Sequence, residues 1–128
     1  MMNLQVGVDL VEIPRIAAVL QRHGQRFLDR IYTPAEQARA RGRPAELASR
    51  FAAKEATMKA LGTGRLGVGW REVEVLSDRR GRPLIFLHGR AAARAAALGL
   101  VTFSVSLSHE RTMAIAMVVA CGEGAATR

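Results

Sequence analysis

The sequence predicts a single domain of the α+β class. Its 128 residues suit one domain with a substantial core, and 49% hydrophobic with 23% charged residues is ordinary globular composition. Segments that alternate like strands and segments with helical periodicity follow one another without regular strand–helix–strand repetition, which favours α+β. No repeat and no long linker divides the chain, so we expect residues 1–120 to form the domain and residues 121–128 a flexible tail.

The order of elements follows from hydrophobic periodicity and from the residues that start and stop helices. The first half should contain a strand over 3–9, a helix over 14–31 interrupted at Gly24, a short helix started by the Thr33–Glu36 capping box, and a helix over 46–61 capped by Gly62. The second half should contain strands over 72–77 and 84–88, an alanine-rich helix over 90–98, a strand over 101–107, a turn over 108–111 and a strand over 112–120.

A formal net charge of +8 indicates an anionic partner. Nucleic acid, an anionic membrane, a phosphorylated small molecule and an acidic protein are the candidates. Four Phe, one Trp and one Tyr leave little for base stacking, which disfavours single-stranded nucleic acid. The sequence has no signal-peptide pattern and no apolar run of membrane-spanning length, and its one cysteine, Cys121, excludes an internal disulfide. We therefore expect a cytoplasmic protein.

Only two of the nineteen basic residues are lysines, and both lie in Lys54-Glu55-Ala56-Thr57-Met58-Lys59. Lysine supplies a mobile point charge, whereas arginine supplies a planar fork. Glu55 and Lys59 are four residues apart and share a helix face. Lys54 falls inside the apolar stripe of that helix, so it is either a snorkelling or ion-paired structural charge, or a charge near bound anions at a cleft.

Asp9 follows an alternating apolar strand and has two interpretations. It either caps the helix that follows, or it pairs with Glu55 as two carboxylates around a hard cation. Mg²⁺ commonly takes one or two protein carboxylates, several waters and substrate phosphates, and the lysines would balance the phosphate charge. This second interpretation predicts phosphoryl or pyrophosphate chemistry.

Two further groups of residues have both a structural and a functional interpretation. His109 follows Ser108 directly, which is poor geometry for a serine–histidine pair, so His109 is either a solvated turn residue or a donor to a phosphate. Arg15, Arg22 and Arg26 share the face of their helix opposite its apolar side, without acidic residues four positions on. They form either a solvated face or a docking surface for an acidic protein helix.

Three segments together resemble holo-[acyl-carrier-protein] synthase, the small class of 4′-phosphopantetheinyl transferases. They are Val6-Gly-Val-Asp-Leu-Val-Glu-Ile-Pro-Arg15, Arg50-Phe-Ala-Ala-Lys-Glu-Ala-Thr-Met-Lys-Ala-Leu-Gly62 and Val105-Ser-Leu-Ser-His109. The resemblance covers nearly the whole chain and includes the Tyr32-Thr33-Pro34 step and the Gly81-Arg82-Pro83 turn. Gln5 departs from the glycine of many relatives without touching any expected ligand.

The resemblance implies Mg²⁺-dependent transfer of 4′-phosphopantetheine from coenzyme A to a serine of acidic apo acyl carrier protein, with release of adenosine 3′,5′-bisphosphate, in fatty acid biosynthesis. It also implies a homotrimer with active sites between subunits. Asp9 and Glu55 would hold the metal, Glu55, Lys59 and His109 would act in catalysis, and Glu55 or a metal-bound water would be the base. The residues implied to contact coenzyme A are Arg50, Lys54, Lys59, Gly62, Ser108 and His109, and those implied to dock the carrier are Arg15, Arg22 and Arg26.

Two other functions compete with this expectation. A non-enzymatic basic module that binds RNA or an acidic protein would tolerate Glu55→Gln, since losing one carboxylate does not weaken anion binding. A different Mg²⁺-dependent nucleotide enzyme would show no preference for coenzyme A over ATP.

Overall fold

Two antiparallel sheets and five α-helices make up the described part of the chain, residues 1–64 and 66–123 of a computed structural model. In chain order the elements are β1 (Met2–Glu12), α1 (Ile13–His23), α2 (Gln25–Ile31), α3 (Pro34–Ala40), α4 (Pro44–Leu61), the 3₁₀ turn η1 (Trp70–Glu72), β2 (Val73–Ser77), β3 (Pro83–Leu87), α5 (Gly89–Leu98), β4 (Thr102–His109) and β5 (Met113–Glu123). The α+β class predicted from the sequence is confirmed.

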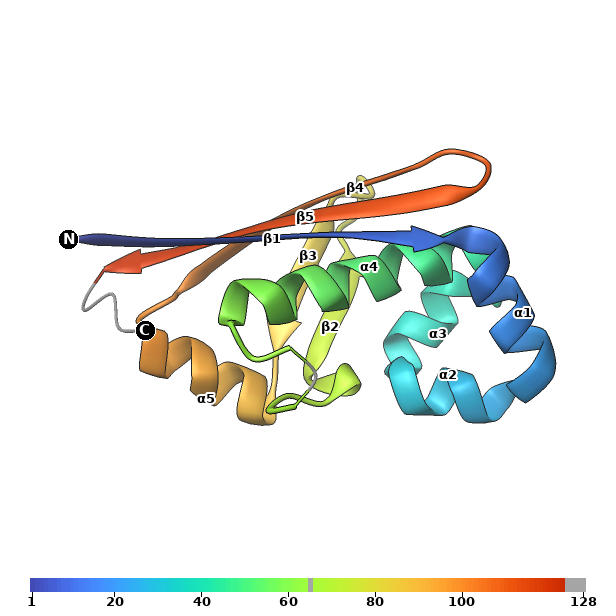
Figure 1. Ribbon diagram of the computed structural model, residues 1–128, viewed down its shortest axis with the longest axis horizontal. Helices are drawn as coiled ribbons and strands as arrows, with labels where there is room; N and C mark the ends of the chain where they lie inside the picture. Colours follow the sequence, from blue (N-terminus) through green and yellow to red (C-terminus); the bar gives the residue numbers. More distant parts are fainter. Residues whose placement is uncertain (65, 124–128) are drawn as a thin grey trace.

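The central helix α4 lies against one face of the larger sheet, whose strand order is β1-β5-β4 (Figure 1). Helices α1, α2 and α3 cluster at the end of the molecule where β1 stops, and α5 lies toward the opposite end (Figure 1). The β2-β3 hairpin packs beside α4. Because α4 contacts the sheet, α1, β2 and α5, it is buried on most sides and not only along the apolar stripe that the sequence predicts.

Gly7 lets β1 pass directly against α4. A Cβ atom at Gly7 would lie 1.9 Å from the carbonyl oxygen of Ala56, so any side chain would force the strand and the helix apart. On the helix, Ala52, Ala53 and Ala56 are fully buried and keep the surface flat. This close approach holds Asp9, the next β1 residue on the inner face, next to α4.

Several element boundaries differ from the sequence prediction. Strand β1 continues past Asp9 to Glu12, and Glu12 is the N-cap of α1, so Asp9 does not cap that helix. Strand β4 reaches His109, which places Ser108 and His109 in the strand and not in the turn. Strand β5 runs on to Glu123, with Cys121 opposite Leu4, so the predicted tail is wrong for residues 121–123; residues 124–128 lie outside the described part.

Other local predictions are confirmed. The chain is interrupted at Gly24, where φ is 55°, between α1 and α2. The Thr33–Glu36 capping box forms with both of its hydrogen bonds, and Gly62 is the C-cap of α4. No helix within the described residues is both long enough and apolar enough to cross a bilayer.

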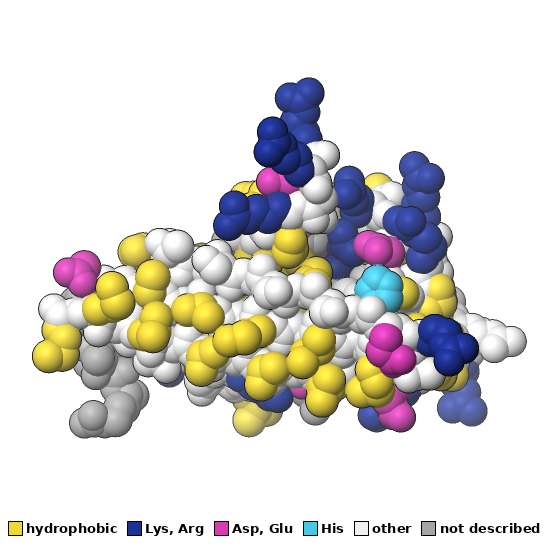
Figure 2. Space-filling model, turned by 90° about the horizontal axis from the view of Figure 1, so that it is seen from above, with side chains coloured by type: hydrophobic (Ala, Val, Ile, Leu, Met, Phe, Trp, Pro, Cys, Tyr) yellow, Lys and Arg dark blue, Asp and Glu magenta, His cyan; other side chains and the backbone are white. Residues whose placement is uncertain are grey.

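The outer face of the β1-β5-β4 sheet, turned away from α4, is apolar and exposed. On β1 its side chains are 50–61% exposed from Leu4 to Leu10, and on β5 Ile115 and Met117 are 37% and 48% exposed. Figure 2 shows these apolar side chains as a band along the sheet. A contiguous apolar face of this kind is typical of a surface that another protein covers.

Candidate active site

A groove of about 540 Å³ contains both carboxylates that the sequence singles out. Asp9 enters it from β1 and Glu55 from α4. The ammonium of Lys59, one helical turn after Glu55, lies 2.9 Å from the carbonyl oxygen of Val8 and 3.2 Å from Oδ1 of Asp9. The structure therefore brings Asp9, Glu55 and Lys59 together from two distant segments.

The donor set in the groove fits a hard divalent cation. Asp9 and Glu55 both offer carboxylate oxygens, and Asp9 is 17% exposed, so its carboxylate is accessible from the groove. Among residues 1–64 and 66–123, no group of three or more His, Cys, Asp or Glu side chains is placed to hold a metal. Mg²⁺ usually needs only one or two protein carboxylates, because water and substrate phosphates complete its coordination.

One wall of the groove is apolar. Phe51 of α4 and Trp70 of η1 stack with ring centroids 4.7 Å apart and an interplanar angle of 28°. The remaining apolar and charged lining residues are Leu10, Val11, Glu12, Arg15, Ile16, Val19, Phe27, Arg30 and Ile31. The groove thus has a charged end at Asp9 and Glu55 and an apolar wall beside it.

A second cleft of about 730 Å³ adjoins the groove and shares Arg30 and Trp70 with it. The glycine-rich loop that follows α4 forms its edge, with Thr63, Gly64 and Gly69, and Arg90 of α5 closes it. Gly62 begins this loop but does not line the cleft. Its backbone N–H donates to the carbonyl oxygens of Met58 and Lys59, and its φ of 73° favours glycine.

Sequence reasoning missed Trp70 and Arg30 as residues of the groove. Trp70 is the only tryptophan of the chain, but its position depends on a 3₁₀ turn that no periodicity predicts. Arg30 continues the four-residue spacing of Arg22 and Arg26, and that spacing could have pointed to it.

Lys54 is a buried, ion-paired structural charge, one of the two interpretations that the sequence leaves open. Its side chain is 0% exposed, and Nζ lies 2.8 Å from Oε1 of Glu36. Nζ also donates to the carbonyl oxygens of Trp70, at 3.0 Å, and Val73. Burial lowers the pKa of Lys54, and the Glu36 carboxylate opposes that shift. With its three protons engaged inside the chain, Lys54 has none left for a phosphate.

Arg50 is also engaged inside the chain. Its side chain is 3% exposed, with Nη1 2.8 Å from Oε1 of Glu46 and Nε 3.2 Å from the carbonyl oxygen of Val75. Neither Arg50 nor Lys54 lines the groove. The coenzyme A contacts that the resemblance implies for these two residues therefore do not fit the geometry of this chain.

His109 and Ser108 lie away from the groove of their own chain. His109 pairs with Ala114 of β5, whose partner on β1 is Val11. Since neighbouring strands are about 4.8 Å apart, His109 lies roughly 10 Å from β1 across the sheet. Ser108 alternates with Leu107, which packs toward the core, so it faces the exposed outer side of the sheet. Strand β5 thus separates His109 from Asp9 within the chain.

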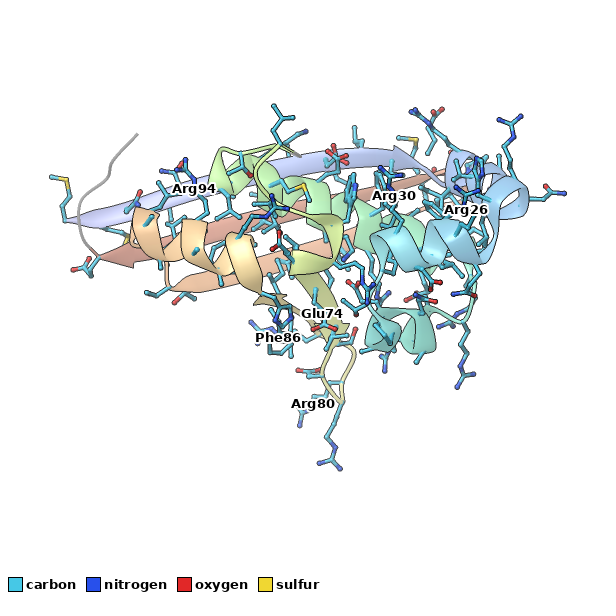
Figure 3. The ribbon with its side chains drawn as sticks, turned by 90° about the horizontal axis from the view of Figure 1, so that it is seen from below. Arg26, Arg30, Glu74, Arg80, Phe86 and Arg94 are labelled. Carbon is cyan, nitrogen blue, oxygen red and sulfur yellow. The ribbon has the colours of Figure 1, made fainter. Side chains whose placement is uncertain are left out.

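The three predicted docking arginines are exposed on adjoining helices, Arg15 and Arg22 on α1 and Arg26 on α2. Because Gly24 separates the two helices, they do not form the single straight row that the sequence predicts. Arg26 and Arg30 lie along α2 (Figure 3). One small hollow on α1 shares Val19 with the groove, and another between the end of α1 and α2 shares Phe27 and Arg30 with it.

Comparisons with known proteins agree with the motifs in the groove. The family model described as 4′-phosphopantetheinyl transferase superfamily matches residues 5–117. The chain is 51% identical to holo-[acyl-carrier-protein] synthase of Herpetosiphon aurantiacus over 126 residues, covering 93% of this chain and 99% of that relative. It is 53% identical to the holo-[acyl-carrier-protein] synthase of Solidesulfovibrio magneticus over 116 residues, covering 89% and 94%.

A solved structure gives the same fold with a bound nucleotide. The crystal structure of Helicobacter pylori holo-[acyl-carrier-protein] synthase in complex with coenzyme A matches with a TM-score of 0.82 and 30% identity, covering 90% of this chain and 98% of that chain.

Proposed function

The chain belongs to the 4′-phosphopantetheinyl transferase superfamily, and we propose that it transfers 4′-phosphopantetheine from coenzyme A to a serine of apo acyl carrier protein. Adenosine 3′,5′-bisphosphate is the second product. The observation that carries this proposal is the groove in which Asp9 and Glu55 meet from two segments of the family motif, with Lys59 paired to Asp9 at its edge. The curated relatives described above, which are about half identical to this chain, carry the corresponding name.

Asp9 and Glu55 fit Mg²⁺, which when bound would neutralise charge on the pyrophosphate. Lys59 adds a point charge beside Asp9, where it can also reach a phosphate oxygen. Glu55 takes the proton of the attacking serine hydroxyl, directly or through a water. The serine oxygen then bonds to the phosphorus that carries pantetheine, and the bond from that phosphorus to the oxygen bridging the two phosphates breaks.

The apolar wall of the groove suits the uncharged part of the substrate. Pantetheine is a long, flexible chain without charge, and Phe51 and Trp70 offer it a flat surface next to the carboxylates. Burial of that chain would hold the reacting phosphorus close to Glu55, which lowers the entropy cost of the reaction.

A homotrimer with active sites between subunits accounts for two features of the single chain. The exposed apolar face of the β1-β5-β4 sheet would be buried in such an assembly. Ser108 faces that same side, and His109 stands at its edge, so both could reach the groove of a neighbouring subunit. His109 would then donate to a phosphate that its own chain does not hold.

The basic surface of α1 and α2 is the proposed docking site for the acidic carrier. Arg22 and Arg26 each line a small hollow beside the groove, and Arg15 and Arg30 line the groove itself. Their shared positive charge would attract and orient an acidic helix. We propose that the protein acts on this carrier in the cytoplasm, in fatty acid biosynthesis.

The proposal is tested by incubating the protein with coenzyme A, Mg²⁺ and apo carrier and then weighing the carrier. We expect a mass gain of one phosphopantetheine group, which Glu55→Gln abolishes while carrier binding survives. Glu46→Gln, on the same helix but outside the groove, is the matched control and should keep the activity. Absence of any gain with several carriers, or full activity of Glu55→Gln, would contradict the proposal. Equal use of ATP would favour the nucleotide-enzyme alternative.

A further inference from the structure

One buried ammonium connects the core to the wall of the groove. Lys54 donates to the carbonyl oxygen of Trp70 at the start of η1 and to that of Val73 just after its end. Both ends of the 3₁₀ turn are therefore fixed to the same atom of α4.

The partner of Lys54 is itself held firmly. Oε1 of Glu36 accepts the N–H of Thr33 at 2.8 Å, and Oε2 accepts the N–H of Val75 at 2.7 Å. Glu36 and Lys54 are both 0% exposed. The pair thus joins the start of α3, the middle of α4 and the first residues of β2.

Several other contacts of η1 lie closer to solvent. Glu72 accepts the backbone N–H groups of Gly69 and Arg90, and Arg71 donates to the carbonyl oxygen of Asp29 at 3.4 Å. Trp70, carried by this turn, stacks on Phe51 and lines both the groove and the adjoining cleft. A buried ion pair is a poor source of stability compared with apolar residues of the same size, so its presence here calls for another role.

We propose that Lys54, together with Glu36, is a positioning residue for the substrate groove: it fixes η1 and so holds the Trp70 indole against Phe51 as the groove wall. The link between Lys54 and Trp70 stands on the contacts of this chain alone. The identity of the substrate that meets the wall rests on the proposed function.

The first test replaces the pair by neutral residues of similar size, Lys54→Met with Glu36→Gln, so that neither buried charge is left alone. Trp70 is the only tryptophan, so its fluorescence reports the position of η1 directly. We expect a red-shifted emission and a clearly larger quenching by acrylamide in this double variant. Tyr32→Phe is the control, because it removes a buried hydrogen bond to Leu47 from the same core without touching η1. Unchanged quenching in the double variant would overturn the proposal.

The second test asks whether Lys54 acts through Trp70. We expect Trp70→Ala to raise the KM for coenzyme A by about 5- to 10-fold with a smaller change in kcat, because it removes binding surface and not a reacting group. The double variant should show a similar KM, and adding Trp70→Ala to it should add little, since both changes remove the same wall. Additive losses, or an unchanged KM in Trp70→Ala, would overturn the proposal.

The fluorescence test and the kinetic test together distinguish failure of this proposal from failure of the proposed function. If Lys54→Met with Glu36→Gln does not fold, Lys54→Arg, which keeps both charges but has a longer and planar head group, takes its place in the quenching and KM measurements, with the same outcomes. If the wild-type protein transfers nothing, the proposed function fails, and fluorescence quenching still decides whether Lys54 positions Trp70.

Discussion

The two lysines of α4 form two ion pairs of opposite character. Lys54 and Glu36 are both fully buried, whereas the side chain of Lys59 is 52% exposed and pairs with Asp9 at the edge of the groove. The lysines are five residues apart, which turns them by about 140° around the helix axis. Lys54 consequently points to α3 and η1, and Lys59 points to β1.

Burial, and not residue type, distinguishes the structural charge of Lys54 from the charge of Lys59, to which the proposed function gives a role in catalysis. A buried ammonium with three fixed partners cannot move to a ligand, while an exposed one beside a carboxylate can exchange partners. The same hexapeptide thus contributes one buried ion pair to the core and one exposed ion pair to the edge of the groove.

The largest expected effect is the loss of stability when the buried lysine is replaced. Lys54→Met should lower the free energy of unfolding by about 3–5 kcal/mol, because it leaves Glu36 charged and buried without its ammonium. Lys59→Met should cost less than about 1 kcal/mol, as expected for an exposed pair. Urea unfolding of both variants measures the difference. Equal losses of stability would contradict the distinction between the two pairs.

The next largest effect is the loss of transfer rate when the exposed lysine is replaced. Lys59→Met should slow phosphopantetheine transfer by about 10- to 100-fold, because a charge near the phosphates is lost. Steady-state kinetics with coenzyme A measures this loss. Lys59→Arg should recover only part of the rate, since the guanidinium is larger and planar. A Lys59→Met enzyme with wild-type kinetics would remove Lys59 from the site.

The sequence predicts the different surroundings of the two lysines. It predicts only one member of each ion pair, the lysine, and not the partner. Helical periodicity places Lys54 among apolar residues and Glu55 with Lys59 on another face, and both placements agree with the exposures in the structure. The partner of Lys54 could not be predicted. Glu36 belongs to a capping box on another helix, where its local role already explains it.

The sequence does not predict the strand boundaries either, because they also depend on a partner that is distant in the chain. Alternation alone suggested that the first strand ends at Asp9, but β5 extends far enough to pair with every β1 residue from Met2 to Glu12. The length of a strand therefore depends on its partner. The position of Trp70 depends on Lys54 across the core, which no local pattern contains.

A smaller effect is expected at the basic surface, which lies outside both ion pairs. Arg22→Glu should raise the KM for the carrier by about 5- to 10-fold and leave the KM for coenzyme A unchanged, because only encounter with the acidic protein is weakened. Added salt should reduce this difference. Arg80→Glu makes the same charge change on the β2–β3 turn, remote from α2 (Figure 3), and should have little effect. Equal losses for both substrates would count against docking at α1.

The smallest effect concerns the exposed side of η1. The backbone N–H groups of Gly69 and Arg90 hold the pKa of Glu72 below its ordinary value of 4.5. The ionised carboxylate therefore contributes stability above that value, and the contribution is lost as the pH falls through the folded-state pKa. Glu72→Gln should flatten this acid part of the stability profile, measured by urea unfolding at several pH values. Parallel profiles for both proteins would show that Glu72 does not anchor the turn.

The proposed function treats Asp9 and Glu55 as one Mg²⁺ site, and a double-mutant cycle on the rate of carrier modification tests whether they act together. Asp9→Asn and Glu55→Gln should each slow transfer by on the order of 100- to 1000-fold at saturating coenzyme A, since either change removes a ligand of the same cation. Combining them should slow it little further, because the shared site is already lost. A double variant whose loss equals the product of the two single losses would show that Asp9 and Glu55 do not share one cation.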